Sequence, residues 1–461
     1  MEDQVTAAVT RLREQAGHWA ARPVEERIAV LAAWADQIKQ RRGELVAAIA
    51  ADTGRVGLSE MEVDWVFGAI QRQSRWARDL VPAPARPSSD PSVTIADAPV
   101  PLGVVGVISP WNFPFQLALI DAIPALLAGC PVLMKPSELC PSFVPVLRAT
   151  VAAVPDLAQV LQIVEGGPDV GRAVVANVDA VCFTGSVSTG RAVAAAAAAA
   201  FIPAFLELGG KDPAVVAASA DLEVATSGVL WGATANTGQS CMSIERVYVE
   251  RAVADRFVEL LVTKAQRVTL ALPGREDGDL GPFIDPRQVD VVRRHLEDAV
   301  TRGAQIRCGG EIEVHDGRSY LRPTVLTGVD HSMLVMTEET FGPIIPVMVV
   351  ADLDEAVALA NDTQYGLSAA VFAEPEEARR VAARIHAGGI SINDVCLTGL
   401  VPEGEKQAFR SSGLGPSRMG PASLRRFLRQ RVLLERQNPT VQPWWYDAGR
   451  DGSKYSFSYA Q

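Results

Sequence analysis

Apolar residues recur at every third or fourth position along most of residues 4–80, and this period predicts helices. The stretch VEERIAVLAAWADQIKQRRGELVAAIAADTG (24–54) shows it clearly, and Gly54 is expected to end the pattern. The stretch VPAPARPSSDPS (81–92) follows and is rich in helix-breaking residues, so it is predicted to be a loop or crossover.

From residue 102 onward, short apolar runs bounded by glycine or proline alternate with longer helix-like segments. Strands are predicted at 102–109, 130–136, 160–167 and 180–186, and helices at 115–129, 142–154, 169–178 and 191–200. Because the strand-like runs are almost wholly apolar, they are expected to be buried on both faces. The alternation therefore predicts βαβ units and a parallel sheet, an α/β fold.

A second alternating series begins near Lys211. It predicts helices at 252–268, 291–308 and 354–362, and strands at 245–250, 343–350 and 388–393. Two α/β units of similar size fit the length, and no internal repeat is visible. The last stretch (437–461) has no regular period but is aromatic, with Trp444, Trp445, Tyr446, Tyr455, Phe457 and Tyr459.

Length and charge restrict the class of protein. A chain of 461 residues suggests two or three domains at roughly 100–200 residues per domain. The net charge is −11, and no Lys/Arg-rich block occurs, which argues against nucleic-acid or membrane partners. The longest apolar stretch, AVAAAAAAAF (192–201), is too short to span a bilayer, and no secretory signal is visible. The six cysteines are scattered without a CxxC pair, so we expect free thiols and a cytoplasmic location.

Short polar motifs stand at the predicted strand ends, where open α/β sheets bind ligands. They are SPWNFP (109–114), KPSE (135–138), LELGGK (206–211) and EETFGP (338–343). After the strand at 180–184 comes GSVSTG (185–190), where Gly185 permits a turn and Ser186 begins a helix. That turn is either a phosphate site or an ordinary capped helix start. Taken singly, each motif is better explained as a turn after a strand or a surface carboxylate than as a ligand site.

Cys241 follows the small polar residues of NTGQS. The sequence alone leaves it as a structural thiol, a redox thiol or a nucleophile. The chain holds only five histidines, and no Cys/His pair can be inferred from spacing.

Six motifs in order, SPWNFP, KPSE, FTGS, LELGGK, GQSC and EETFGP, resemble the aldehyde dehydrogenase superfamily, from about residue 20 to about residue 430. The separation of Glu207 and Cys241 is also similar to that family's. The resemblance implies a Rossmann-type NAD-binding domain (1–82 and 100–208) and an α/β catalytic domain (209–411). It also implies a small β oligomerisation element that has a hairpin near 83–99 and continues into 412–461.

The resemblance further implies NAD(P)-dependent oxidation of an aldehyde to its acid. Cys241 would be the nucleophile that forms a thiohemiacetal and then a thioester. Glu207 would activate the hydrolytic water, and it is also available to assist the thiol. The side-chain amide of Asn112 and the backbone N–H of Cys241 would form the oxyanion hole. No metal is implied.

Cofactor contacts follow from the same motifs. Lys135 and Glu138 resemble the adenosine-ribose ligands, and Ser186 the pyrophosphate contact, with Trp111 nearby. Glu339 resembles the nicotinamide-ribose ligand, and Phe341 packs beside that ring. Because a ribose carboxylate repels a 2′-phosphate, Glu138 favours NAD. Because Lys135 is close to Glu138 in the sequence and carries a positive charge, NADP binding stays possible.

The segment expected at the substrate mouth departs from the family pattern. The common PFGGxKxSG region reads EKQAFRSSGLGPSRMG (405–420), where only SGLG is kept and Ser417 replaces a frequent glutamate. Candidate substrate residues are Trp231, Thr234, Met242 and Arg410, although Trp231 equally fits the core and Arg410 a surface salt bridge.

An apolar aliphatic or aromatic aldehyde is the predicted substrate. The alternatives are a semialdehyde, a CoA-acylating reaction, a cofactor-free thiol esterase, and a non-catalytic crystallin-like protein. A homo-oligomer, dimer or tetramer, is expected.

Overall fold

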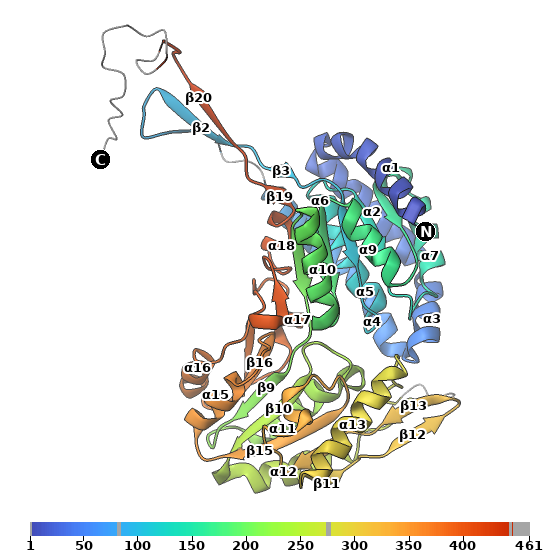
Figure 1. The fold of residues 1–461 in the computed structure, drawn as a ribbon, viewed down its shortest axis with the longest axis vertical. Helices are drawn as coiled ribbons and strands as arrows, with labels where there is room; N and C mark the ends of the chain where they lie inside the picture. Colours follow the sequence, from blue (N-terminus) through green and yellow to red (C-terminus); the bar gives the residue numbers. More distant parts are fainter. Residues whose placement is uncertain (1, 81–83, 273–277, 442–444, 446–461) are drawn as a thin grey trace. The chain divides into compact units, whose positions relative to one another are not determined.

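A computed structural model describes residues 2–80, 84–272, 278–441 and 445. The chain forms two compact units, one from residues 1–79 and 101–427 and the other from residues 80–100 and 428–461 (Figure 1). The first unit contains two large sheets with their helices, and it holds all of the residues predicted for catalysis and cofactor binding.

The N-terminal helices confirm the predicted period. They are α1 (Glu2–Ala21), α2 (Val24–Gln40), α3 (Arg42–Thr53) and α4 (Val56–Arg78). Gly54 ends α3 in the left-handed conformation, with φ 72°, and its N–H donates to the Ala50 carbonyl. A Cβ at this position would lie 2.5 Å from Pro282, so both space and backbone favour glycine.

The first sheet has six strands in the order β18–β8–β7–β4–β5–β6. Their bounds are β4 (Val105–Ile108), β5 (Val132–Lys135), β6 (Leu161–Ile163), β7 (Ala180–Thr184), β8 (Ala204–Glu207) and β18 (Gly413–Leu414). Every pairing is parallel except that of β18 with β8, which confirms the predicted parallel sheet.

Helices cover both faces of this sheet. Helices α1, α9 (Pro168–Asn177) and α10 (Val187–Ala200) pack on one face through a shared apolar core. The other helices of this part are α5 (Pro114–Leu119), α6 (Ala122–Leu127), α7 (Val144–Ala152), α8 (Pro155–Val160) and α18 (Ala422–Arg425). The prediction of a single helix at 115–129 is wrong, because the helix is interrupted at Asp121, between α5 and α6. Pro124 has no N–H to donate to the Ile120 carbonyl, so a continuous helix would lose a hydrogen bond there.

The second sheet has seven strands in the order β11–β14–β15–β10–β9–β16–β17. They are β9 (Asp212–Val216), β10 (Ile244–Glu250), β11 (Gln305–Cys308), β14 (Thr324–Thr327), β15 (Ile344–Val350), β16 (Ser368–Phe372) and β17 (Gly389–Ile392). Helices α11 (Leu222–Thr234) and α12 (Arg251–Ala265) pack on one face. Helices α13 (Arg287–Thr301), α15 (Leu353–Asn361) and α16 (Pro375–Ala382) pack on the other (Figure 1).

The helix predicted at 291–308 is correct only in its first part. Helix α13 ends at Thr301, Gly303 has φ 104°, and Gln305–Cys308 forms the edge strand β11. The smaller elements are β3 (Val100–Pro101), β12 (Ile312–His315), β13 (Arg318–Leu321), α14 (Leu334–Thr337), α17 (Leu397–Leu400), β19 (Leu428–Arg429) and the 3₁₀ turns η1 (Ala235–Gly238) and η2 (Arg410–Ser412). Within the described ranges, no helix is both long and apolar enough to cross a membrane.

The second unit contains a three-stranded antiparallel sheet of β1 (Arg86–Pro87), β2 (Val93–Asp97) and β20 (Val432–Arg436). The hairpin expected near residues 83–99 is formed by β1 and β2. Of the aromatic tail, Trp445 is described and is exposed. Trp444, Tyr446, Tyr455, Phe457 and Tyr459 lie outside the described residues. The division into NAD-binding, catalytic and oligomerisation domains stays a prediction.

Candidate functional site

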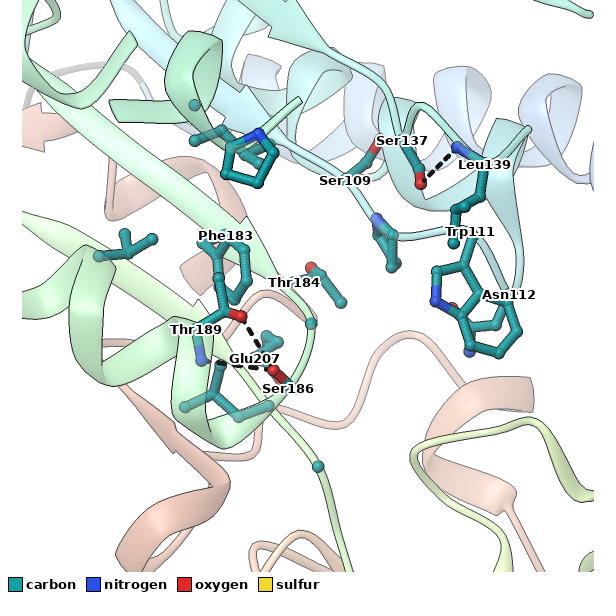
Figure 2. Close-up of a pocket in the computed structure, with 18 of the residues that line it drawn as sticks. Ser109, Trp111, Asn112, Ser137, Leu139, Phe183, Thr184, Ser186, Thr189 and Glu207 are labelled. Atoms are coloured by element: carbon teal, nitrogen blue, oxygen red, sulfur yellow. Dashed lines mark hydrogen bonds between the residues drawn. The ribbon is translucent and has the colours of Figure 1, made fainter. Parts of the chain in front are cut away.

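A cavity of about 660 Å³ in the first unit opens at the carboxyl ends of β4, β5, β7 and β8 (Figure 2). Every residue predicted for catalysis or cofactor binding lines it, namely Trp111, Asn112, Lys135, Glu138, Gly185, Ser186, Glu207, Cys241, Glu339 and Phe341. These residues come from six separate sequence segments, at 111–112, 135–138, 185–186, 207, 241 and 339–341. The fold therefore brings together the motifs that the sequence only placed in order.

Cys241 lies just after the 3₁₀ turn η1, with its side chain partly exposed to the cavity. Burial raises the pKa of its thiol to about 11; Lys406 lowers it, and the Glu207 carboxylate raises it. At neutral pH the resting thiol is therefore protonated. A thiolate is the reactive form, so attack requires that a base or a ligand promote the loss of the proton.

Gln239 fixes the loop that holds Cys241. Its side-chain oxygen accepts from the Ile284 N–H at 2.9 Å, and its side-chain nitrogen donates to the carbonyls of Asn236 at 3.0 Å and Pro282 at 3.2 Å. Asn236 itself has φ 55°, a left-handed conformation that these bonds help to hold. The position of Cys241 is thus set before any ligand arrives.

Asn112 is tied to the same loop. Its side-chain amide donates to the Gln239 carbonyl at 3.0 Å, which occupies one of its two hydrogens. Its backbone carbonyl accepts from Arg55 at 2.7 Å, and Arg55 is paired with the buried Glu62 at 2.7 Å. Glu62 also accepts the Phe115 N–H at the start of α5, at 3.0 Å. Asn112 can therefore offer its second amide hydrogen from a fixed position.

Glu207 ends β8 and is half-buried. Its carbonyl accepts from the Gly185 N–H at 3.2 Å, and Gly413 of β18 pairs with it on the other side. Thr184 lies opposite Glu207 in the register of β7 with β8. The ends of these strands open to the same cavity (Figure 2), which Cys241 also lines.

The turn at Gly185 and Ser186 leads into α10. Ser186 caps this helix, because its hydroxyl oxygen accepts the Thr189 N–H at 3.3 Å. A Cβ on Gly185 would lie 2.6 Å from the Phe183 ring, so only glycine fits. The capped-helix explanation is confirmed, and the helix start also faces the cavity, where its free N–H groups suit a phosphate oxygen.

Two carboxylates and one ammonium offer partners for ribose hydroxyls. Lys135 Nζ lies 2.9 Å from Glu138 Oε2. Burial alone would raise the pKa of the Glu138 carboxyl, but the hydrogen bond and charge of Lys135 have the larger combined effect, so the pKa of Glu138 is lowered. Burial and the nearby Glu245 raise the pKa of Glu339 to about 8, and the Gly210 N–H donates to Glu339 at 3.1 Å. The helix start lines the same cavity and adds N–H donors to these carboxylate acceptors.

A buried ion pair supports the loop that carries Glu339. Lys211 Nζ lies 2.7 Å from Glu245 Oε2 and 3.0 Å from the Thr340 hydroxyl. Glu245 accepts the backbone N–H groups of Thr340 and Phe341, both at 2.8 Å. Phe341 packs edge-on against Trp111, with ring centroids 5.5 Å apart. Sequence reasoning missed Glu245, although a lone carboxylate at the start of an apolar strand is an available signal.

The predicted substrate residues do not line this cavity. Trp231 is 51% exposed on α11, so the core alternative is excluded. Thr234 is buried, and its hydroxyl donates to the Leu230 carbonyl at 2.7 Å. Met242 follows Cys241; its sulfur lies 3.3 Å from the Thr398 hydroxyl, and its carbonyl lies 3.4 Å from Cys396 Sγ.

Arg410 does not line this cavity either. Its guanidinium donates to the carbonyls of Asn361, at 2.7 Å, and Thr363, and among the described residues it forms no salt bridge, contrary to the surface alternative. The cation that acts on Cys241 is Lys406, whose stem passes over Gly389 beside Thr398. Within the described part of the chain, its ammonium has no ion-pair partner.

Other lining residues were also missed. Arg287 pairs with Asp285 at 2.8 Å, and both line the cavity with Arg172 and Thr184. Arg172, Asp285 and Arg287 stand in segments without a motif, so no local signal marked them, whereas Thr184 belongs to the FTGS motif but was not singled out. Across the described ranges, no group of three or more His, Cys, Asp or Glu side chains could hold a metal ion.

Comparison with known proteins agrees with this geometry. A model of the aldehyde dehydrogenase family matches residues 1–433. The chain is similar to a protein of Mycolicibacterium smegmatis named "Putative succinate-semialdehyde dehydrogenase", with NADP+ in its name. The two are 37% identical over 85% of this chain and 77% of that one.

Solved structures agree as well. The structure of "Putative Aldehyde Dehydrogenase PutA" from Anabaena variabilis has a TM-score of 0.95 and 51% identity over 97% of this chain and 96% of that one. Betaine aldehyde dehydrogenase from Staphylococcus aureus, in complex with NAD+, has a TM-score of 0.90 and 29% identity over 96% of this chain and 89% of that one.

Proposed function

Because the chain belongs to the aldehyde dehydrogenase family, we propose that it oxidises an aldehyde to its carboxylic acid with NAD or NADP as oxidant. The observation that supports this most directly is one cavity lined by a cysteine, a carboxylate, an amide and a dinucleotide-fitting donor set. Fold alone would not support a reaction, because one fold can host many activities.

In the first half-reaction, Cys241 loses its proton to water, and its sulfur attacks the aldehyde carbon. The second amide hydrogen of Asn112 and the backbone N–H of Cys241 donate to the oxygen as it becomes negative, which stabilises the thiohemiacetal. The nicotinamide, when bound, supplies the acceptor for the hydride that leaves this carbon. Glu339 and the Trp111–Phe341 pair line the end of the cavity that we assign to the nicotinamide ring. The product of this step is a thioester on Cys241.

In the second half-reaction, Glu207 takes a proton from a water that attacks the thioester carbon. The carbon–sulfur bond breaks, Cys241 regains a proton, and the carboxylic acid leaves. Because Glu207 lines the cavity with Cys241, we favour water over CoA as the acyl acceptor. The same three side chains argue against a non-catalytic crystallin-like role.

Arg287 bears on the choice of cofactor. It is exposed and lies within electrostatic reach of Glu138, at the end of the cavity assigned to the adenosine ribose. A carboxylate there favours NAD, whereas a nearby guanidinium can accept a 2′-phosphate. We therefore propose that both cofactors bind, with NAD preferred.

The aldehyde class is proposed from the surroundings of Met242. Met242, Cys396 and Thr398 form a mainly apolar group next to Cys241, which supports an apolar aldehyde. Lys406 favours a second candidate, a semialdehyde whose carboxylate would meet its unpaired ammonium. A comparison of hexanal with succinic semialdehyde separates the two. Lys406→Met should then raise KM roughly tenfold for the semialdehyde alone, if one charged hydrogen bond is lost, whereas its effect on thiol acidity should lower kcat for both aldehydes.

An exposed apolar strand and the free cysteines bear on assembly and location. Strand β20 exposes Val432, Leu433 and Leu434 on a short sheet, and such a strand is suited to pairing with a second copy. We propose a homo-oligomer, dimer or tetramer, in the cytoplasm, where its six free cysteines would stay reduced. A monomer at micromolar concentration in light scattering would contradict the assembly.

The central test uses three variants and NADH formation. Cys241→Ala should abolish turnover while NAD binding, followed by fluorescence titration, persists. Glu207→Gln should give one burst of NADH and then stall at the thioester. Asn112→Ala should lower kcat by about 10²–10³, as expected for one oxyanion donor. Normal NADH production by Cys241→Ala would refute the proposed function.

A further inference from the structure

A buried cluster of two arginines and one aspartate lies behind the cavity. Arg418 Nη2 is 2.6 Å from Asp121 Oδ2, and Arg426 Nη2 pairs with Asp121 Oδ1. All three side chains are almost fully buried. Two guanidinium groups for one carboxylate leave an excess positive charge in a low-dielectric interior, which is costly unless another anion lies close.

Strand alternation places this cluster on the same side of the sheet as Glu207. In β7, Val181 and Phe183 face the core of α1, α9 and α10, so Thr184 faces the opposite side. In β8, Leu206 faces that same core, so Phe205 and Glu207 face away from it.

The contacts of Phe205 confirm that its side chain faces away from the core formed with α1, α9 and α10. Its ring lies 5.3 Å from the Arg426 guanidinium carbon and packs edge-on against Phe427 at 5.7 Å. Phe205 therefore lies on the face of β8 that packs against the arginine cluster. Glu207, two residues further along the strand, lies on the same face.

Arg418 has a second partner, the Thr184 hydroxyl, at 2.8 Å. A guanidinium can only donate, so the Thr184 oxygen accepts and its own hydrogen is free to donate elsewhere. Glu207 is the residue opposite Thr184 on the neighbouring parallel strand. Adjacent strands lie about 4.8 Å apart, a separation at which side chains on one face can meet. The Glu207 carboxylate is thus the acceptor best placed for that hydrogen.

Two further observations point the same way. Among the described residues, the buried Arg418 Nε has no hydrogen-bond partner. Burial opposes the charge of Arg418, but Asp121 and then Glu207 raise its pKa, so Glu207 is its next carboxylate after Asp121. The cluster therefore has an unused donor on Arg418 and an excess positive charge that the Glu207 carboxylate partly offsets.

We propose that Arg418 is a positioning residue for Glu207: through Thr184 and its excess charge, it orients the Glu207 carboxylate and stabilises its negative charge for the attack of water on the thioester. The inference rests on the proposed role of Glu207 in the proposed function. Arg418 touches neither aldehyde nor cofactor, so its effect should appear in thioester hydrolysis and not in thioester formation.

The test uses p-nitrophenyl acetate, which acetylates Cys241 without cofactor. The burst of p-nitrophenolate reports acylation, and the steady rate reports hydrolysis. Arg418→Met should keep the burst, slow the steady rate by roughly tenfold as part of the general-base contribution is lost, and move the acidic limb of its pH profile upward by about one unit. Arg418→Lys should restore much of both.

Two more variants keep the test decisive. Thr184→Val removes the linking hydroxyl without changing charge, and it should slow hydrolysis several-fold even if Arg418→Met does not fold. Arg425→Met is the matched control, because Arg425 is an exposed neighbour that pairs with Glu405 and lies outside the cluster. It should change neither phase.

The outcomes separate the two proposals. A normal steady rate and an unshifted acidic limb in both Arg418→Met and Thr184→Val would overturn the role of Arg418. Absence of NADH formation from every aldehyde by the wild-type enzyme would instead overturn the proposed function, while the ester assay would still report on Cys241 and Glu207.

Discussion

The reactivity of Cys241 depends on the charges around a single buried sulfur. Burial holds its pKa at about 11, Lys406 lowers it, and Glu207, Asp212 and Glu339 raise it. Three carboxylates against one ammonium keep the resting thiol protonated at neutral pH. This protects the nucleophile from oxidation until a ligand fills the cavity, because the thiolate is the form that oxidants attack.

Alkylation of Cys241 by iodoacetamide should therefore depend steeply on pH. Below a pKa of about 11, the thiolate fraction rises about tenfold for each unit of pH, so the rate should rise about 100-fold from pH 7 to pH 9. Lys406→Met should slow the reaction several-fold at every pH in this range, because it removes the nearby cation that favours the thiolate.

Mass spectrometry can follow Cys241 beside buried Cys182, which serves as an unreactive internal reference. A rate that is already constant at pH 7 would show that the thiolate predominates in the resting protein. An unchanged rate in Lys406→Met would show that Lys406 does not act on the sulfur.

At the scale of elements, strand β8 depends on the short strand β18. Gly413 pairs with Glu207, and the Leu208 N–H donates to the Ser412 carbonyl at 2.9 Å. A Cβ on Gly413 would lie 2.6 Å from the Leu206 carbonyl oxygen and 2.8 Å from the Ala408 side chain. No larger residue fits without moving β18 away from the strand that holds Glu207.

Gly413→Val should lower the free energy of unfolding by about 1–3 kcal/mol, the range for overpacking a tight site. It should also slow thioester hydrolysis, since Glu207 loses its backbone partner. Urea denaturation and the steady ester rate measure the two effects. Gly404→Ala is the matched control, because its nearest neighbour is an ordinary 3.8 Å from the added Cβ; a similar loss in both variants would contradict the explanation.

At the scale of the whole molecule, the buried His295 couples folding to pH. It lies on α13 with Nδ1 3.1 Å from the Thr340 hydroxyl, and burial lowers its pKa from 6.5 to about 3, with Lys211 and Arg294 adding to the shift. The unfolded chain takes up a proton on this residue below about pH 6.5, whereas the folded protein does not until about pH 3. Its contribution to stability is therefore lost as the pH falls through this window.

Acid titration of the unfolding free energy should show this loss, with a slope of up to about 1.4 kcal/mol per pH unit from one histidine. In His295→Gln, the slope between pH 6 and pH 4 should decrease by about that amount. His18→Gln, at an exposed position on α1, should leave the slope unchanged. Equal slopes in wild type and His295→Gln would mean that His295 is protonated in the folded protein.

Sequence periodicity predicted β4, β5, β6 and β7 of the first sheet and β10, β15 and β17 of the second, because these strands are short apolar runs. It did not predict β9, β14 or β16 of the second sheet. It failed at residues 302–308, where Gly303 reverses the chain into β11, and at Asp121, where Pro124 interrupts a helix-like run. The residues at strand ends were found because motif and topology coincide there. Arg418, Lys406 and Glu245 were missed, because only the tertiary fold brings them to Glu207, Cys241 and Glu339.

The attachment of β18 also makes residues 396–412 an insert with two fixed ends, held between them by further bonds such as that of the Phe409 N–H to the Gly366 carbonyl at 2.9 Å. One end is held where Cys396 Sγ meets the Met242 carbonyl, and the other where Ser412 and Gly413 pair with β8. A protein engineer could replace the stretch between these anchors with that of a relative to change the accepted aldehyde. Because Lys406 lies inside the insert, each exchange would also alter thiol acidity. New substrate preferences obtained in this way would therefore come with a changed sensitivity to oxidants.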